Sequence, residues 1–188
     1  MRLEDTGVHT ALDAADGGWN TQPDLRDAAV AVILVERDRQ DRVLFTRRRD
    51  DLPWHAGQVS FPGGMREADE MPQACARRET CEEIGVREEA LEVLGRLRDR
   101  VSIAGFLVAP FVFRLTEAQP YAIQTSEVAE VFEVPYAFLL ETSRWKEEPA
   151  THPRARVRVI PSIEYEGRNV WGLTAIIVKD FLKALEPR

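Results

Sequence analysis

The chain has 188 residues, of which 44% are hydrophobic and 30% charged, and its net charge is −7. These values are ordinary for one soluble globular domain with a substantial core, and the acidic balance excludes a broad nucleic-acid surface. No apolar run reaches the roughly 18 residues of a membrane span, so we expect no membrane insertion. An anionic small-molecule substrate is still compatible, because a local basic patch or a bound cation outweighs the overall sign.

The first 25 residues are polar and interrupted by glycine and proline, which predicts an N-terminal extension with one short helix around 11–15. A single domain is expected to follow over residues 26–188. Its first segment, 28–36, is a Val- and Ile-rich apolar run that predicts a buried strand. Residues 42–48 predict a second strand, and the two strands form a hairpin.

A predicted loop over 51–57 leads to a short strand at 58–61 and then to Pro62-Gly63-Gly64. Glycines at this point permit close approach of the backbone to a ligand or a metal. Arg48 is the middle one of three consecutive arginines just before the loop. A phosphate contact and a solvated strand end are equally open interpretations of this side chain.

The next segment predicts a helix that begins at Pro72 and stops at Gly85, since proline suits a first helical turn and glycine a helix end. Three acidic side chains share one face of this helix because they are spaced i, i+3 and i+4. These residues, called here the helix glutamates, are Glu79, Glu82 and Glu83. The opposite face, expected to pack on the core, carries Ala74, Cys81 and Ile84.

The helix glutamates repel one another by roughly 0.2–0.5 kcal/mol per pair. Mg²⁺ or Mn²⁺ would turn this repulsion into coordination, because hard cations prefer carboxylate oxygens. The alternative is a solvated acidic helix face, which three acidic residues alone would favour. The residues around the helix are therefore needed to decide between the two.

The second half of the chain contains further strand signals and ends in an amphipathic helix at 172–185. Strands are predicted at 91–97, 106–115 and 127–135, a closing hairpin at 162–166 and 169–170, a short helix at 136–141, and loops at 100–105 and 144–153. Pro110, inside a predicted strand, indicates an edge position or a bulge. Arg154, Arg156 and Arg158 alternate with apolar residues, which predicts either a charged edge strand or a strand that contacts substrate phosphate. This order of strands and helices suits an α/β fold with a mixed sheet between helices.

The two cysteines, Cys75 and Cys81, are six positions apart on the predicted helix. Their side chains therefore point to different faces and do not bridge easily. Unpaired cysteines and the lack of a secretory segment predict a cytoplasmic location. The sequence leaves the oligomeric state open, with a homodimer among the options.

The order of residues around the helix glutamates resembles a known family motif. Gly64 is followed after five residues by Glu70 and after seven more by Arg78-Glu79-Thr80-Cys81-Glu82-Glu83-Ile84-Gly85-Val86. This stretch resembles the Nudix box, G-x5-E-x7-R-E-U-x-E-E-x-G-U with U aliphatic, and departs from it only at Thr80. The resemblance implies a Nudix hydrolase with an α/β/α sandwich fold.

A second motif resembles that of the coenzyme A pyrophosphatases in this superfamily, L-L-T-x-R-(S/A)-x3-R-x3-G-x3-F-P-G-G. The matching residues are Leu44-Phe45-Thr46, Arg48, Gly57 and Phe61-Pro62-Gly63-Gly64. Further similarity to that group lies in Gly105-Phe106, Pro110-Phe111, Ser126-Glu127-Val128, Val134-Pro135, Trp171-Gly172 and Thr174-Ala175. Arg49 departs from a Ser or Ala of the motif, and Pro53 departs from an Arg that would supply a bidentate phosphate donor.

The resemblance implies metal-dependent hydrolysis of a nucleoside-linked diphosphate, with CoA giving 4′-phosphopantetheine and 3′,5′-ADP. It assigns the metal, Mg²⁺ or Mn²⁺, to Glu79, Glu82, Glu83 and the Gly63 carbonyl. It assigns an orienting role to Arg78 and a supporting role to Glu70. Glu82 is a candidate base, and Glu127 or Glu130 is an additional candidate ligand or base. The candidate substrate contacts are Arg48, His55, Gly57 and Phe61, although His55 alone also fits a local hydrogen-bonding residue.

Two other functions remain open. The departures at Arg49 and Pro53 are compatible with another nucleotide substrate, such as ADP-ribose, NADH or a dinucleoside polyphosphate. A Nudix-fold binding module without catalysis is the third reading, against which the intact helix glutamates argue.

Overall fold

The computed structural model describes residue 1, residue 3, residues 7–8 and residues 12–186. The elements follow in the order β1 (Arg26–Arg37), β2 (Gln40–Arg48), β3 (Val59–Ser60), β4 (Gly63–Met65), α2 (Pro72–Ile84), η1 (Glu88–Ala90), β5 (Leu91–Arg96), β6 (Arg100–Val101), β7 (Phe106–Leu115), β8 (Val128–Pro135), α3 (Tyr136–Leu140), η2 (Thr142–Arg144), β9 (Lys146–Pro149), β10 (Val159–Tyr165), β11 (Arg168–Trp171) and α4 (Gly172–Ala184). Here η marks a short 3₁₀ helix.

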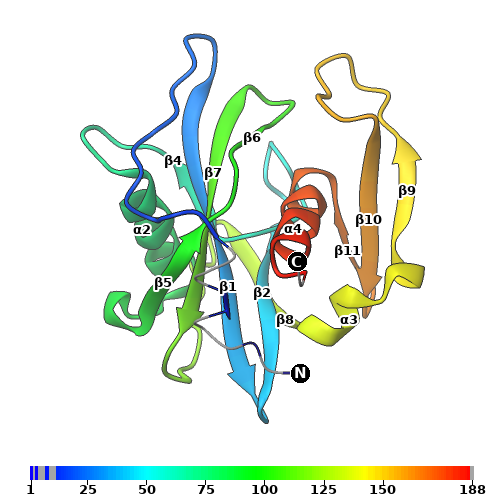
Figure 1. The fold of residues 1–188 in the computed structure, drawn as a ribbon. Coiled ribbons are helices and arrows are strands. Elements are labelled where there is room, and N and C mark those ends of the chain that lie inside the picture. The colour runs from blue at the N-terminus through cyan, green and yellow to red at the C-terminus, as the bar shows by residue number, and fades with distance from the viewer. Residues whose placement is uncertain (2, 4–6, 9–11, 187–188) are drawn as a thin grey trace.

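An eight-stranded mixed sheet forms the centre of the molecule (Figure 1). Strand β1 pairs with β7 in parallel and with β2 in antiparallel fashion. The β1–β2 ladder runs only from the Ile33/Leu44 pair to the hairpin turn, so the other ends of the two strands separate. Strand β4 pairs with β1 beyond this point, while β3 and β8 pair with β2. The sheet therefore opens into a fork that contains the Pro62-Gly63-Gly64 segment.

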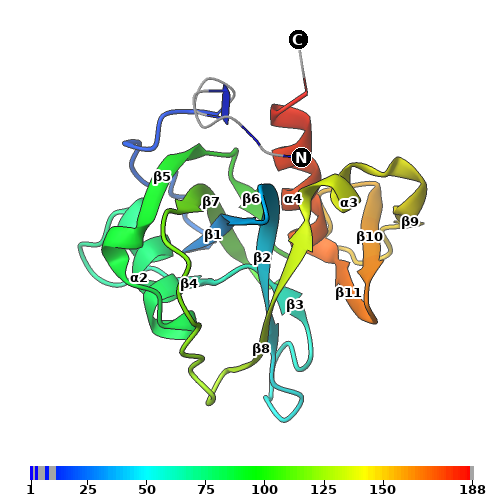
Figure 2. The same ribbon diagram turned by 90° about the horizontal axis from the view of Figure 1, so that it is seen from below.

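Helices cover both faces of this sheet (Figure 2). One face packs against α2 through buried residues that include Ile33, Phe111 and Ile84. The other face packs against α4 and a three-stranded sheet, β11-β10-β9, through residues that include Phe45 and Phe181. The predicted fold class, an α/β fold with a mixed sheet between helices, is confirmed. None of the helices in the described residues has both the length and the apolar character needed to cross a bilayer.

The boundaries of α2 agree with the residues that predicted them. Pro72 occupies the first turn, and Gly85 ends the helix in the left-handed conformation with φ 67°. A Cβ on Gly85 would stand 2.5 Å from the Cβ of Ala122, so only glycine fits there. Thr80, the departure from the Nudix box, is fully buried, and its hydroxyl donates to the Ala76 carbonyl at 2.7 Å. The departure is tolerated because its polar atom is satisfied within the helix.

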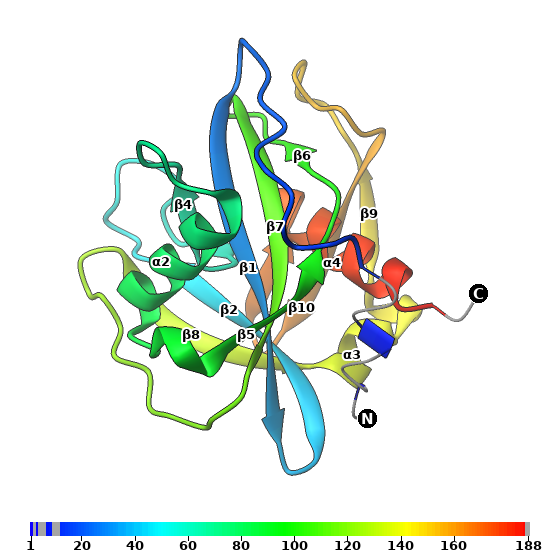
Figure 3. The same cartoon turned by 60° about the vertical axis from the view of Figure 1, so that its left-hand side comes forward.

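The prediction for the core face of α2 was wrong in part. Ala74 is exposed, whereas Cys75 and Ala76 are fully buried beside Ile84. The helix lies across β1 and β4 (Figure 3), and this rotates Glu83 toward the sheet, leaving it 6% exposed. Both cysteines are free thiols, in agreement with the sequence analysis.

Two predicted loops contain strands, and one predicted strand is a loop. Strand β6 lies in the expected loop 100–105, and β9 lies in the expected loop 144–153. Because β9 pairs with β10 from the Pro149/Val159 pair onward, residues 150–158 become the connection between the two strands. Arg154, Arg156 and Arg158 fall in this connection, so the strand predicted from their alternation is absent.

Strand β7 is not an edge strand, contrary to one prediction made from Pro110. It lies between β1 on one side and β5 with β6 on the other. The Pro110 carbonyl accepts a hydrogen bond from the Leu97 amide at 2.9 Å. Since the N–H and C=O of one residue point to the same side of a strand, the missing N–H falls in the interval between the β5 and β6 ladders.

The N-terminal segment contacts the domain at separate points. The short helix expected around 11–15 begins outside the described residues, and 12–15 are not helical. Asp13 instead forms an isolated antiparallel bridge with Arg96. The indole N–H of Trp19 donates to the Glu70 carbonyl at 2.6 Å, which connects this segment to the acidic loop before α2.

Candidate active site

Arg78, on α2, forms hydrogen bonds with three carboxylates of the candidate site. Its guanidinium donates to both oxygens of Glu70, at 2.9 and 3.1 Å, and through Nη1 to Glu79 at 3.0 Å and Glu82 at 3.1 Å. A further bond reaches the Met65 carbonyl at 3.2 Å. The hydrogen bonds to Glu70, more than any other contact, raise the pKa of Arg78. Burial acts to raise the pKa of Glu70, but the bonds from Arg78 and from the Glu67 amide outweigh it and lower that pKa.

Glu83 is the most deeply buried of the helix glutamates. Its Oε2 atom is buried and has no hydrogen-bond partner among the described residues. Burial, followed by the charge of Glu79, raises the pKa of Glu83 to about 8. An unpaired buried carboxylate oxygen is costly for a fold, so this atom indicates a missing positively charged partner.

Glu79 lies directly against the glycine segment of β4. A Cβ on Gly64 would come within 2.3 Å of the Glu79 carboxylate, and one on Gly63 would come within 2.4 Å of the Ala29 carbonyl. Gly63 also has φ 154°. Both glycines are therefore needed for β4 to pass between β1 and the carboxylate. Burial is also the main cause that raises the pKa of Glu79.

These groups fit a hard divalent cation, because the oxygens of Glu79 and Glu83 and the Gly63 backbone are the donors that such ions prefer. The unpartnered oxygen of Glu83 supports the same fit. Glu82 is the most exposed of the helix glutamates, with a side chain 53% exposed, and like Glu79 it is bonded to Arg78. In the described part of the chain, no group of three or more His, Cys, Asp or Glu side chains is arranged so that it could hold a metal ion by itself.

The 116–127 segment fixes the C-terminal end of α2 to the site. The amides of Ala122 and Gln124 donate to the carbonyls of Ile84 and Glu83, each at 2.9 Å. This connection leads directly to Glu127, whose charge contributes to the raised pKa of Glu83. Glu127 is thus placed near the helix glutamates by a segment that is itself bonded to the helix.

The three consecutive arginines have different partners. Arg47 donates to both oxygens of Asp50, at 2.9 and 3.1 Å, and Arg49 to both oxygens of Asp51, at 2.7 and 2.6 Å. Among the described residues the Arg48 side chain reaches only Glu127, at 3.5 Å, and its Nε atom is buried without a partner. Its charge lies close enough to lower the pKa of Glu83. Arg48 is therefore the arginine of this group that is least engaged and lies beside the carboxylates.

Glu130 and Phe61 are not where their predicted roles require them. Glu130 faces the opposite side of the sheet from α2 and pairs with Arg168, at 2.9 Å, and with Arg47, at 3.5 Å. In this structure Glu130 therefore lies away from the helix glutamates. Phe61 is 3% exposed and stacks on Phe45 with ring centroids 4.9 Å apart, so its side chain supports the core and presents no surface to a substrate.

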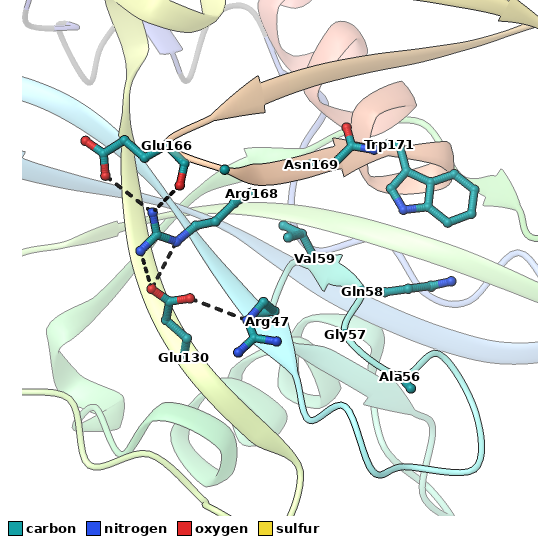
Figure 4. A pocket seen from close by; sticks show the side chains of 11 residues that line it. Arg47, Ala56, Gly57, Gln58, Val59, Glu130, Glu166, Arg168, Asn169 and Trp171 are labelled. Atoms are coloured by element: carbon teal, nitrogen blue, oxygen red, sulfur yellow. Dashed lines mark hydrogen bonds and ion pairs between the residues drawn. The ribbon is translucent and has the colours of Figure 1, made fainter.

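His55 and Gly57 lie in the exposed loop between β2 and β3. His55 Nδ1 is 2.8 Å from Gln58 Oε1, a local contact within the loop. Gly57 has φ 67°, and its amide donates to the Arg49 carbonyl at 3.1 Å. Gly57 lines a pocket of about 660 Å³ that lies between this loop and the β10–β11 hairpin (Figure 4).

Residues 25–159 match the sequence profile of the NUDIX domain. The chain belongs to the Nudix family. It is 38% identical over 156 residues to an uncharacterized Nudix hydrolase, NudL, of Cronobacter sakazakii, which covers 82% of this chain and 80% of that one. A NudL of Yersinia pestis is 36% identical over 155 residues, covering 82% of this chain and 77% of the other. The protein is accordingly a Nudix pyrophosphohydrolase, and enzymes of this family generally use divalent metal cations.

Solved Nudix structures share the fold. A MutT/nudix family protein from Enterococcus faecalis superimposes with a TM-score of 0.57 at 16% identity, covering 90% of this chain and 66% of that one. An Ap4A hydrolase complex from C. elegans gives a TM-score of 0.51 at 20% identity, covering 57% of this chain and 78% of that one. At these identities the likeness concerns the fold alone.

Several residues around the pocket carry no predicted role. They are Gln58, Arg168, Asn169 and Trp171. The one sequence signal was the similarity at Trp171-Gly172 to the coenzyme A pyrophosphatases, which gave no function for the side chain. The pocket joins segments more than 100 residues apart, so no local pattern revealed it.

Proposed function

We propose that this Nudix enzyme is a diphosphatase of CoA and its acyl derivatives, which releases 4′-phosphopantetheine, or its acyl form, and 3′,5′-ADP. The observation that carries the proposal is the buried, unpartnered oxygen of Glu83 next to Glu79, with Arg48 close by. Arg48 and Gly57 belong to the motif that resembles coenzyme A pyrophosphatases, and both lie around the opening of the β1–β2 fork.

The physical requirement of the reaction accounts for this arrangement. A diphosphate repels a nucleophile through its own charge, and Mg²⁺ or Mn²⁺, when bound, supplies neutralisation and acidity for the attacking water. Glu79, Glu83 and the Gly63 carbonyl would hold the ion. Arg78 orients the carboxylates through its hydrogen bonds and does not contact substrate. Glu82, which is exposed beside them, is the candidate base.

Arg48 is proposed to bind a substrate phosphate. Its guanidinium has one long contact, at 3.5 Å to Glu127, so it can turn to a phosphate at little cost. Arg49 cannot take this role without breaking its two bonds to Asp51 and one to the Thr125 carbonyl.

Replacing Arg48 by Ala is expected to raise KM by roughly 10- to 100-fold with a smaller change in kcat, as a charged hydrogen bond contributes about 1.5–3 kcal/mol. Steady-state kinetics measure this. Arg49→Ala is the matched control, because it removes the neighbouring guanidinium without touching the proposed phosphate contact. An unchanged KM for Arg48→Ala would make Arg48 a structural residue.

A second substrate class is favoured by one observation. Pro53 replaces the arginine of the CoA motif, and Arg49, bound to Asp51, does not supply the lost guanidinium. A Nudix diphosphatase that acts on ADP-ribose, NADH or a dinucleoside polyphosphate is therefore the second candidate.

The test is turnover of a diphosphate panel with Mg²⁺ and with Mn²⁺, with products separated by chromatography. The panel contains CoA, acetyl-CoA, oxidised CoA, ADP-ribose, NADH and a diadenosine polyphosphate. Preferential release of 3′,5′-ADP from CoA is the expected result. Cleavage of another member with CoA left intact would overturn the CoA proposal in favour of the second candidate. If no member of the panel is cleaved and millimolar metal does not raise the melting temperature, the result would favour a binding module.

A further inference from the structure

None of the helix glutamates lines the pocket beside the β10–β11 hairpin. The loop before β3 forms one wall and β11 the opposite wall (Figure 4). Its volume of about 660 Å³ falls within the range of roughly 300–1,000 Å³ that is typical of small-molecule pockets. The hydroxyl of Thr174 donates to the Val59 carbonyl at 3.1 Å, which holds the start of α4 against β3. The two walls are therefore fixed relative to each other without a ligand.

Strand β11 lines this pocket with Arg168, Asn169 and Trp171. Val170 is fully buried in the core, so Asn169 and Trp171, on either side of it, point the other way. Trp171 is 42% exposed, so its ring is accessible to a ligand. Among the described residues nothing accepts a hydrogen bond from its indole N–H, and the Asn169 amide likewise has no partner there. Both groups are free to contact a ligand.

The charges of the pocket cancel. Arg47 and Arg168 line it together with Glu130 and Glu166, and Arg168 pairs with both glutamates. A bare anion therefore finds no excess of positive charge. The remaining groups are an aromatic face and amides, which suit a flat, uncharged ring with hydrogen-bonding edges.

The pocket and the helix glutamates lie on opposite faces of the paired strands β2 and β8. Arg47 and Arg48 are consecutive on β2, so their side chains point to opposite faces. Arg48 lies near Glu127 and Glu83, whereas Arg47 lies in the pocket with Glu130. The loop 49–58 follows Arg48 directly, and its last three residues, 56–58, line the pocket, so this loop connects the two faces.

We infer that the pocket binds the nucleobase of the substrate, with the base stacked on Trp171 and its edge bonded to the amides of Asn169 and Gln58. Gln58 Oε1 is engaged by His55 at 2.8 Å, and its NH₂ group is left to donate. The inference rests on the proposed function in taking the ligand to be the nucleoside part of the diphosphate substrate.

Calorimetric titration with free adenosine, in the presence of EDTA, tests the pocket without metal or phosphate. Wild-type protein is expected to bind adenosine and not ribose. Trp171→Ala is expected to weaken this binding by roughly 5- to 150-fold, the loss of one base–aromatic stack, with Trp171→Phe retaining most of it. Trp54→Ala is the matched control, since Trp54 is 77% exposed and lies outside the pocket. Asn169→Ala provides a second variant, expected to weaken binding even if Trp171→Ala does not fold.

Each outcome decides the question. Equal adenosine binding by wild type, Trp171→Ala and Asn169→Ala would overturn the inference, as would binding of pantetheine in place of adenosine. Trp171-dependent adenosine binding in a protein that cleaves no diphosphate of the panel would uphold the pocket while the proposed function fails. Cleavage of a panel member without any adenosine binding would contradict the nucleobase pocket and leave the proposed function standing.

Discussion

Glu83→Gln is expected to lower kcat by at least about 100-fold while the fold is kept. The substitution removes a charge at nearly constant shape from the most buried of the helix glutamates. Loss of one preorganised charge-stabilising group typically costs about 10²–10³ in rate. Glu92→Gln, which removes an exposed glutamate on β5, is the matched control and should retain wild-type turnover. Near-normal activity of Glu83→Gln with Mg²⁺ would show that the metal site is assigned wrongly.

Thermal unfolding separates this loss from a folding defect. Without metal, Glu83→Gln should melt at the same temperature as wild type or higher, because the buried oxygen without a partner is costly in the wild type. Millimolar Mg²⁺ or Mn²⁺ should stabilise wild type, by about 2.7 kcal/mol at a concentration of 100 Kd, and should have little effect on the variant. An equal metal-induced shift in both proteins would place the ion elsewhere.

Arg78→Ala is expected to reduce both activity and stability. The side chain of Arg78 is 23% exposed and bonds three carboxylates, so its removal leaves Glu70 and Glu79 without their cation. Breaking a buried ion pair costs about 3–5 kcal/mol, and partial exposure reduces this to roughly 2–4 kcal/mol here. Urea unfolding and steady-state kinetics measure the two losses. Arg78→Lys should recover part of the stability and less of the activity, because lysine lacks the fork that spans both oxygens of Glu70.

The neighbouring Arg77 gives a matched control on the same helix. Arg77 packs over the ring of Phe113 at 5.5 Å and bonds the Glu88 carbonyl, away from the carboxylates. Arg77→Ala should keep full activity and lose about 1 kcal/mol of stability at most. If both arginine variants lost activity equally, the effect of Arg78 would be a general helix defect.

The strands with an apolar pattern were predictable because their side chains carry the signal. Residues 28–36 and 106–115 are apolar on nearly every position and become the two central parallel strands. Strand β9 carries no such signal, as all four residues from Lys146 to Pro149 are exposed, and within the described part of the chain its strand pairing is the ladder with β10. Pairing of this kind depends on the partner strand, which a local pattern does not contain.

The site was predictable where the family motif specifies it and less so where tertiary packing decides. The motif named the helix glutamates, Arg78 and the glycine pair. The structure brings these residues together at the fork between β1 and β2, with the side chain of Glu82 at the exposed edge of the group. The helical wheel placed Glu83 on the face opposite the expected core and could not show its burial, because the depth of a side chain depends on what the helix packs against. The position of Glu130 depends on packing in the same way, since it pairs with Arg168 and Arg47 rather than lying beside Glu83.

The adjacency of Arg47 and Arg48 on β2 has a consequence for the evolution of this enzyme. Because the two side chains point to opposite faces, an insertion or deletion of one residue within β2 would exchange them and disturb both faces at once. The 49–58 loop and the β10–β11 hairpin are not bound by this constraint, so we expect length changes among relatives there and not within β2. Sequence drift among relatives should concentrate in those two segments.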